Sequence, residues 1–147
     1  MEVKYRKILV PVDGSQNSLR ALAHAVAIAR CFDAELSILY VSVLSPKLPV
    51  TPQIQGDKIP AKAVSDPEAF AKEILANAAA HVPADIQMKT YSELGEPRTG
   101  IIDFAEKHGF DLLIIGSRGL GAISGLLLGS VSTYVIHHCQ SPVLTVK

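Results

Sequence analysis

The residues whose types and spacing could do chemistry are three glycines and a serine that lie between two apolar segments. Gly116 and Gly119 follow the aliphatic run of residues 111–115, and Gly129 is followed directly by Ser130. Glycine allows a tight turn and a close approach of backbone N–H groups to a ligand. A helix that begins near Ser130 would point its unpaired N–H groups and its positive dipole end at the same ligand. The pattern predicts an anion site, and phosphate is the expected anion.

Other phosphate motifs do not fit this stretch. A Walker loop needs G-x4-G-K-[ST], but residues 125–129 have the wrong spacing and no lysine. A dinucleotide fingerprint would follow the first strand, not the fourth. The alternative explanation is a flexible connection, with Arg118 as a surface charge and Ser130 as a helix cap. Asp13 has a similar alternative as a turn or capping residue.

The elements that position these residues alternate between strands and helices. Aliphatic runs predict strands at 7–13, 34–42, 85–93, 111–115 and 141–147, and helix starts follow at Ser15, 65–68, 95–97 and Ser130. This order is typical of an α/β domain with a doubly wound parallel sheet, either flavodoxin-like or Rossmann-like. Ligands of such sheets bind where the chain reverses direction, beyond the carboxyl ends of the strands. We expect Asp13 and Gly116 to border that crevice.

A long irregular stretch interrupts the pattern between the second strand and the next helix. Residues 43–64 are rich in Pro, Gly and Lys and leave the carboxyl end of a strand. Loops of this length in a compact domain are usually functional or partly disordered. The stretch is therefore either a lid over a ligand or a mobile insertion.

Composition limits the classes of protein. The 147 residues are 48% hydrophobic with a formal net charge of +0 and no Trp, which fits one soluble domain over residues 1–147. Bulk binding to nucleic acid or to an anionic membrane is disfavoured. Neither a signal peptide nor a membrane span is expected, so the cytoplasm is the default location. Cys31 and Cys139 are expected to be buried in a reducing compartment.

Five landmarks of the sequence together resemble the universal stress protein family over essentially the whole chain. The spacing G-x2-G-x9-G-[ST] resembles the nucleotide motif of the ATP-binding branch of that family. The landmarks are PVDGS at 11–15, GEP at 95–97, DLLIIGSRG at 111–119, GSVS at 129–132 and SPVLTVK at 141–147. The resemblance implies a five-stranded parallel sheet in the order 3-2-1-4-5.

The resemblance also implies a role for each matching residue. Pro11, Val12 and Asp13 would lie along adenine and ribose, with the Asp13 carboxylate accepting from ribose hydroxyls or helping indirectly to hold a metal. Val41 would contact adenine through its main chain. The residues expected to contact ribose and phosphates are Gly116, Arg118, Gly119, Gly129, Ser130, Val131 and Ser132. A triphosphate carries about four negative charges and the motif offers one Arg, so Mg²⁺ or Mn²⁺ is expected to neutralise part of the phosphate charge.

The last strand carries a separate expectation. An apolar edge strand at 142–147 is an aggregation hazard unless something pairs with it. Twofold pairing with a second copy would remove that hazard, and the family dimerises through this strand, so a homodimer is expected.

Three functional hypotheses follow. The first is an ATP-binding protein with a nucleotide-dependent regulatory role in the stress response, acting on an unknown protein partner. The second is a slow ATPase, in which only Asp13 could act as a general base or position the attacking water. The third is a nucleotide-free dimeric adaptor. The sequence supports at most weak hydrolysis.

Overall fold

Five parallel strands form one sheet in the order β3-β2-β1-β4-β5 in the computed structural model, which describes residues 1–42, 61–119 and 128–147. The strands are β1 (Lys7–Pro11), β2 (Glu35–Ser42), β3 (Met88–Leu94), β4 (Leu112–Gly116) and β5 (Val143–Val146). All four strand pairs are parallel. The predicted fold class and strand order are confirmed.

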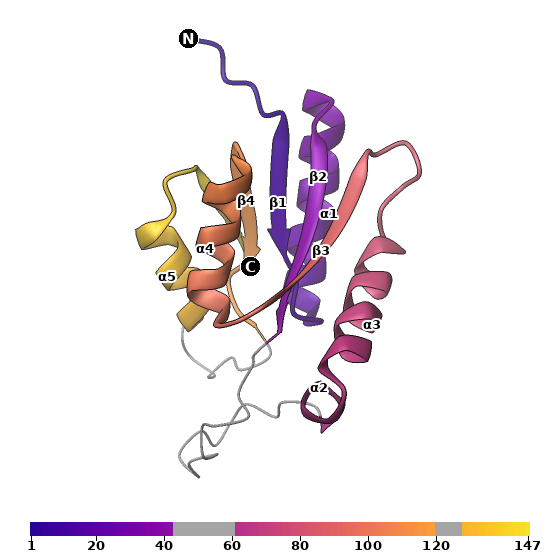
Figure 1. Ribbon diagram of the computed structural model, residues 1–147. Coiled ribbons are helices and arrows are strands. Elements are labelled where there is room, and N and C mark those ends of the chain that lie inside the picture. Colours follow the sequence, from indigo (N-terminus) through magenta and orange to yellow (C-terminus); the bar gives the residue numbers. More distant parts are fainter. Residues whose placement is uncertain (43–60, 120–127) are drawn as a thin grey trace.

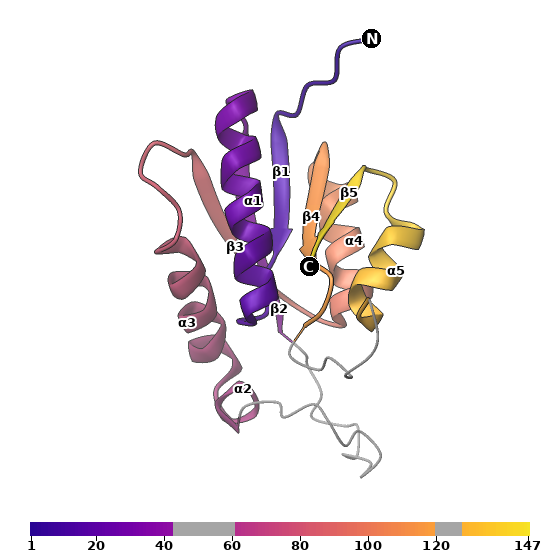
Figure 2. The ribbon, with the colours of Figure 1, turned by 180° about the vertical axis from the view of Figure 1, so that it is seen from behind.

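Helices cover both faces of the sheet (Figures 1 and 2). They are α1 (Gln16–Phe32), α2 (Ala61–Ser65), α3 (Pro67–Ala79), α4 (Pro97–His108) and α5 (Ser130–His138). The helices α1 and α3 pack on one face, and α4 and α5 pack on the other.

The central strands bury side chains in two separate cores because successive residues of a strand point to opposite faces. Ile8 and Val10 of β1 lie in the core under α1 and α3, while Leu9 lies in the core under α4 and α5. The corresponding split in β2 sends Ile38 to the first core and Leu39 to the second. This double burial explains why these strands are aliphatic without alternation.

Side-chain caps fix the starts of three helices. The Ser15 hydroxyl accepts from the N–H of Ser18 at 3.2 Å. Asp66 accepts from Ala69, 3.0 Å away, immediately before Pro67 in α3. Glu96 accepts from Thr99 at 3.0 Å. These starts agree with the helix signals in the sequence.

Some expectations need correction. Residues 61–64, predicted to be irregular, belong to α2, and residues 43–60 of that stretch lie outside the described residues. Strand β1 ends at Pro11, so Val12 and Asp13 lie beyond it. Cys31 is exposed, because it lies on the solvent side of α1, and only Cys139 is partly buried. None of the helices in the described part of the chain has the length and apolar character needed to cross a bilayer.

Candidate functional site

The predicted site residues gather at one edge of the sheet, where the strands end and the helices begin. Strands β1, β2 and β4 end at this edge, and α1, α4 and α5 start there (Figures 1 and 2). The chain passes from β1 to β2 on one side of β1 and later to β4 on the other. The edge beyond β1 and β4 is therefore the switch point of the fold, where ligands bind in open α/β sheets.

Asp13 and Gly119 meet at this switch point. One carboxylate oxygen of Asp13, Oδ1, accepts from the N–H of Ser15 at 2.9 Å. A Cβ placed on Gly119 would lie 2.5 Å from the other oxygen, Oδ2. The segment after β4 thus lies directly against the carboxylate that follows β1, and only a glycine leaves the carboxylate in this position.

Gly116 has a different reason to be glycine. A Cβ at this position would lie 2.9 Å from the backbone C and O atoms of Asn17 in α1. Neither Gly116 nor Gly119 has a positive φ; among the described glycines only Gly14, Gly95 and Gly109 do. The space that α1 occupies against β4, rather than turn geometry, requires glycine at 116.

The start of α5 is fastened to the end of β4 through the carbonyl of Ser117. This carbonyl accepts from the N–H of Gly129 at 2.6 Å and from the hydroxyl of Ser132 at 2.8 Å. Ser132 is only 2% exposed, and its hydroxyl also contacts the Gly129 carbonyl at 3.0 Å. Two of the donors predicted for phosphate are therefore engaged within the protein, and Ser117 is an anchor that the sequence did not indicate.

Other groups at the start of α5 lie at the same edge. The N-cap residue is Gly129, which has no side chain that could accept from the N–H groups of the first turn. Ser130 is exposed, and Val131 is partly buried. The first N–H groups of a helix have no partner inside the helix, so residues 130–132 present main-chain donors at this edge.

The end of β2 extends beyond the end of β1. The ladder between them stops at Pro11 and Leu39, and the N–H of Val12 donates to the Leu39 carbonyl at 2.8 Å. Peptide groups of alternate residues point to the same neighbouring strand. Those of Val41 consequently face the side on which β1 has already ended. The side chain of Val41 is buried, so its main chain is the part that faces the edge.

Tyr40 is a residue of this edge that sequence reasoning missed. Burial raises the pKa of its phenol, and the charge of Asp13 raises it further, against a hydrogen bond with Ser42 that lowers it. Its ring contacts Phe70 of α3 edge to face, with centroids 6.1 Å apart. No sequence motif marks Tyr40, because its closeness to Asp13 depends on the pairing of β1 with β2.

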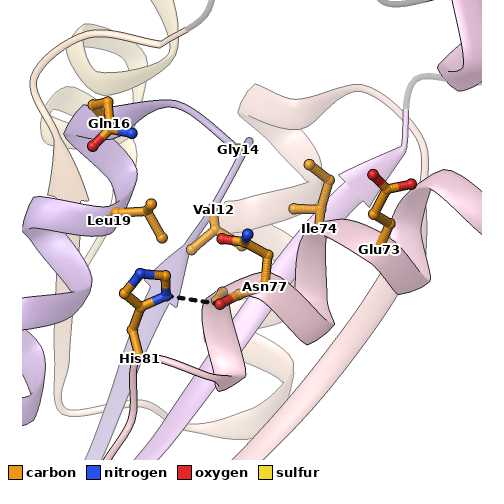
Figure 3. Close-up of a pocket in the computed structure, with 9 residues that line it drawn as sticks. Val12, Gly14, Gln16, Leu19, Glu73, Ile74, Asn77 and His81 are labelled. Carbon is orange, nitrogen blue, oxygen red and sulfur yellow. Dashed lines mark hydrogen bonds between the residues drawn. The ribbon is translucent and has the colours of Figure 1, made fainter.

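A cavity of about 310 Å³ lies behind the turn that carries Asp13, between α1 and α3 (Figure 3). Val12 and Gly14 border it, whereas Gly116, Arg118 and Gly119 do not. Gly14 has φ 86°, and a Cβ there would lie 2.6 Å from Cδ1 of Ile74. The cavity is thus distinct from the switch point between β1 and β4, but both adjoin the turn after β1.

The described residues contain no group of three side chains able to hold a metal ion. Among the described residues, Asp13 is the carboxylate that lies against the glycine segment, and Mg²⁺ in proteins commonly takes one or two carboxylates together with water and phosphate oxygens.

The sheet order, the helices on both faces and the switch point between β1 and β4 define a Rossmann-like α/β domain. The model of the universal stress protein family matches residues 4–147. The chain therefore belongs to the universal stress protein family.

Individual relatives agree with this assignment. The chain is 34% identical to a universal stress protein of Methanocaldococcus jannaschii, covering 97% of this chain and 82% of the relative. The solved structure of UspA from Lactobacillus plantarum has a TM-score of 0.75 at 28% identity and covers 99% and 100% of the two chains. A universal stress protein solved in complex with cAMP has a TM-score of 0.71 at 27% identity over 99% of both chains.

Proposed function

We propose that this chain is an ATP-binding regulatory protein of the stress response that works as a homodimer. The observation that carries the proposal is the contact between Asp13 and Gly119 beside the start of α5. A carboxylate that can accept from sugar hydroxyls lies next to main-chain donors that suit phosphate. A relative of similar fold was solved with cAMP, which supports an adenine nucleotide as the ligand.

In this proposal the adenine ring lies at the ends of β1 and β2. Pro11 and Val12 flank the ring, and the main chain of Val41 forms hydrogen bonds with its edge. Ribose hydroxyls donate to Asp13, whose position is fixed by the N–H of Ser15. Gly116 contributes by letting α1 approach β4.

The phosphates extend from the glycine segment to α5. Arg118 and Gly119 contact the phosphates nearest the ribose, and the first N–H groups of α5 donate to the terminal phosphates. The predicted donors at this end are Gly129, Ser130, Val131 and Ser132. The N–H of Gly129 and the hydroxyl of Ser132 already donate to the Ser117 carbonyl. We therefore favour the main-chain N–H groups of 130–132 and the Ser130 hydroxyl as the phosphate contacts.

A divalent metal fits this arrangement as part of the nucleotide complex. The absence of a side chain at Gly119 lets this segment lie close to Oδ2 of Asp13. Mg²⁺ usually keeps several waters and takes one or two carboxylates together with phosphate oxygens. Bound Mg²⁺ or Mn²⁺ would neutralise phosphate charge, and Asp13 would orient it directly or through water.

The proposed dimer forms through the outer edge of β5. On its inner side β5 pairs with β4, and Leu144 is 38% exposed. Val146 is already buried in the core of the monomer, so a partner strand would cover Leu144 and the outward peptide groups. In this proposal the protein acts in the cytoplasm, where the free thiols of Cys31 and Cys139 stay reduced.

Denaturing mass spectrometry of freshly purified protein is the direct test. Copurified ATP supports the proposal, ADP or AMP favours slow hydrolysis, and no nucleotide favours an adaptor. Calorimetric titration with ATP, AMP and cAMP, with and without Mg²⁺, then measures affinity.

A matched pair of variants locates the site. Asp13→Asn should weaken ATP binding about tenfold to a hundredfold, because a charge-assisted hydrogen bond contributes roughly 1.5–3 kcal/mol. Asp103→Asn, on the exposed surface of α4, should bind as the wild type does. Equal affinity in both variants would refute Asp13 as a ligand of the nucleotide.

A further inference from the structure

Arg98 occupies an unusual position for a cation, in the first turn of α4. The positive end of a helix dipole disfavours a cation there, and the first turn of α4, all of it described, contains no acidic residue. Glu96, the N-cap, offsets this by pairing with Arg98 at 2.8 Å. Burial alone would raise the pKa of Glu96, but hydrogen bonds from Arg98 and from the N–H of Thr99 lower it below its usual value.

The first turn of α4 reaches both ends of the proposed nucleotide site. A Cβ on Gly100 would lie 3.2 Å from Cγ1 of Val41, so this turn lies against the end of β2. On its other side, the guanidinium carbon of Arg98 lies 5.6 Å from the ring centroid of Tyr134 in α5. The N-terminal ends of α4 and α5 lie side by side in both views (Figures 1 and 2).

Tyr134 is close to the end of α5 that faces the phosphates. It follows Ser130 by about one helical turn, or roughly 6 Å along the axis, and helical side chains lean toward the N-terminus. The guanidinium of Arg98 is consequently on the order of 10 Å from the first turn of α5, slightly beyond the roughly 8 Å screening length at physiological salt, so it has to reorient to contact a phosphate there. About half of its side chain is exposed, so it is able to reorient.

We propose that Arg98 is a second basic residue for the nucleotide, which binds the β- and γ-phosphates while Arg118 binds nearer the ribose. This inference rests on the proposed function and adds to it the preference for a polyphosphate over a monophosphate. Guanidinium groups bind phosphate through two parallel N–H donors. Glu96 and the Tyr134 ring hold Arg98 beside α5 until a phosphate tail offers a stronger anionic partner.

Arg30 provides a matched control. It pairs with Asp85 at 3.0 Å, and both side chains are more than half exposed, as in an ordinary surface ion pair. It lies in the last turn of α1, at the opposite edge of the sheet. A substitution there removes the same charge and a similar ion pair without approaching the nucleotide.

The test compares the affinities of adenosine, AMP, ADP and ATP in Mg²⁺ buffer by calorimetry. Arg98→Gln should weaken ATP binding roughly tenfold and leave AMP and adenosine within about twofold. Arg98→Lys should recover part of the loss. Glu96→Gln should tighten ATP binding by several-fold, since it removes both the competing partner and a negative charge. Arg30→Gln should change none of these values, and melting temperatures report whether each variant is folded.

Two results separate this inference from the function on which it rests. If wild type binds ATP and Arg98→Gln leaves the ratio of ATP to AMP affinity unchanged, the role of Arg98 is overturned and the nucleotide site stands. If wild type binds no adenine compound, the proposed function fails and this inference fails with it. A loss of ATP affinity without a loss of AMP affinity in Arg98→Gln, together with a gain of ATP affinity in Glu96→Gln, supports the proposed role of Arg98.

Discussion

Gly116 at the end of β4 lies directly against the backbone of Asn17 in α1. A Cβ at position 116 would be 2.9 Å from two backbone atoms of Asn17, and backbone cannot give way as a flexible side chain can. Gly116→Ala should therefore destabilise the protein by about 1–3 kcal/mol, the usual range for overpacking. Urea denaturation measures this.

The Gly116→Ala variant distinguishes an effect on stability from an effect on ligand contacts. Any loss of ATP binding in Gly116→Ala that accompanies a lower midpoint reports displaced structure, not a lost phosphate contact. A variant as stable as wild type would show that α1 shifts easily on the sheet and would contradict this account.

Gly119→Ala should have the opposite profile. The added Cβ would meet Oδ2 of Asp13 at 2.5 Å, which is the far end of a side chain and can rotate away. Stability should change little, while ATP affinity should fall about tenfold because the carboxylate loses its orientation. Calorimetry and thermal denaturation of the same sample check both halves. Wild-type affinity in this variant would show that Asp13 is not oriented by its contact with Gly119.

The outward edge of β5 offers a clean test of the dimer. The carbonyls of Pro142 and Val146 accept from the N–H groups of Leu113 in β4 and of Ser117 directly after it. By the two-residue period of a strand, the N–H of Thr145 therefore points away from β4. Proline is tolerated at such an edge position, where it removes only the outward donor. Thr145→Pro should give a folded monomer, and wild type a dimer, by light scattering at micromolar concentration.

Leu144→Pro serves as the contrasting variant. The N–H of Leu144 points toward β4, so its loss should destabilise the subunit itself. A dimeric Thr145→Pro variant would place the interface elsewhere.

Tyr40 should give the stability a dependence on alkaline pH. Burial first, and the charge of Asp13 second, raise the pKa of its phenol. Below the ordinary tyrosine pKa of about 10 both folded and unfolded states keep the proton, and the stabilisation is complete. As the pH rises further the unfolded chain ionises first, so the free energy of unfolding falls until the folded-state pKa is passed. Tyr40→Phe should remove this component, and a matched Tyr5→Phe variant should keep it. An unchanged alkaline profile in Tyr40→Phe would contradict it.

The sequence predicted the fold well because the signals were local and strong. Aliphatic runs located the central strands, and the helix starts predicted at Ser15 and at 65–68 are confirmed. Boundaries were less accurate: β1 is shorter than expected, because no residue of β2 pairs with Val12 in the regular ladder.

The gathering of these residues at one edge was predictable, but their contacts were not. The order of strands and helices predicted that Asp13 and Gly116 would lie at one edge, yet it gave no sign that Gly116 serves the packing of α1 or that Ser132 is bonded to Ser117. Those facts depend on contacts between segments far apart in the chain. The position of Arg98 beside Tyr134 could not be predicted for the same reason, since only the packing of α4 on α5 brings the two side chains together.

The turn that carries Asp13 is held from several directions: by the N–H of Ser15, by Ile74 under Gly14, and by the glycine segment after β4. A turn held in this way has little conformational entropy left to lose when a sugar binds. Recognition of ribose should therefore need little rearrangement at this turn. Differences in affinity among adenine nucleotides should then arise mainly from the phosphate end.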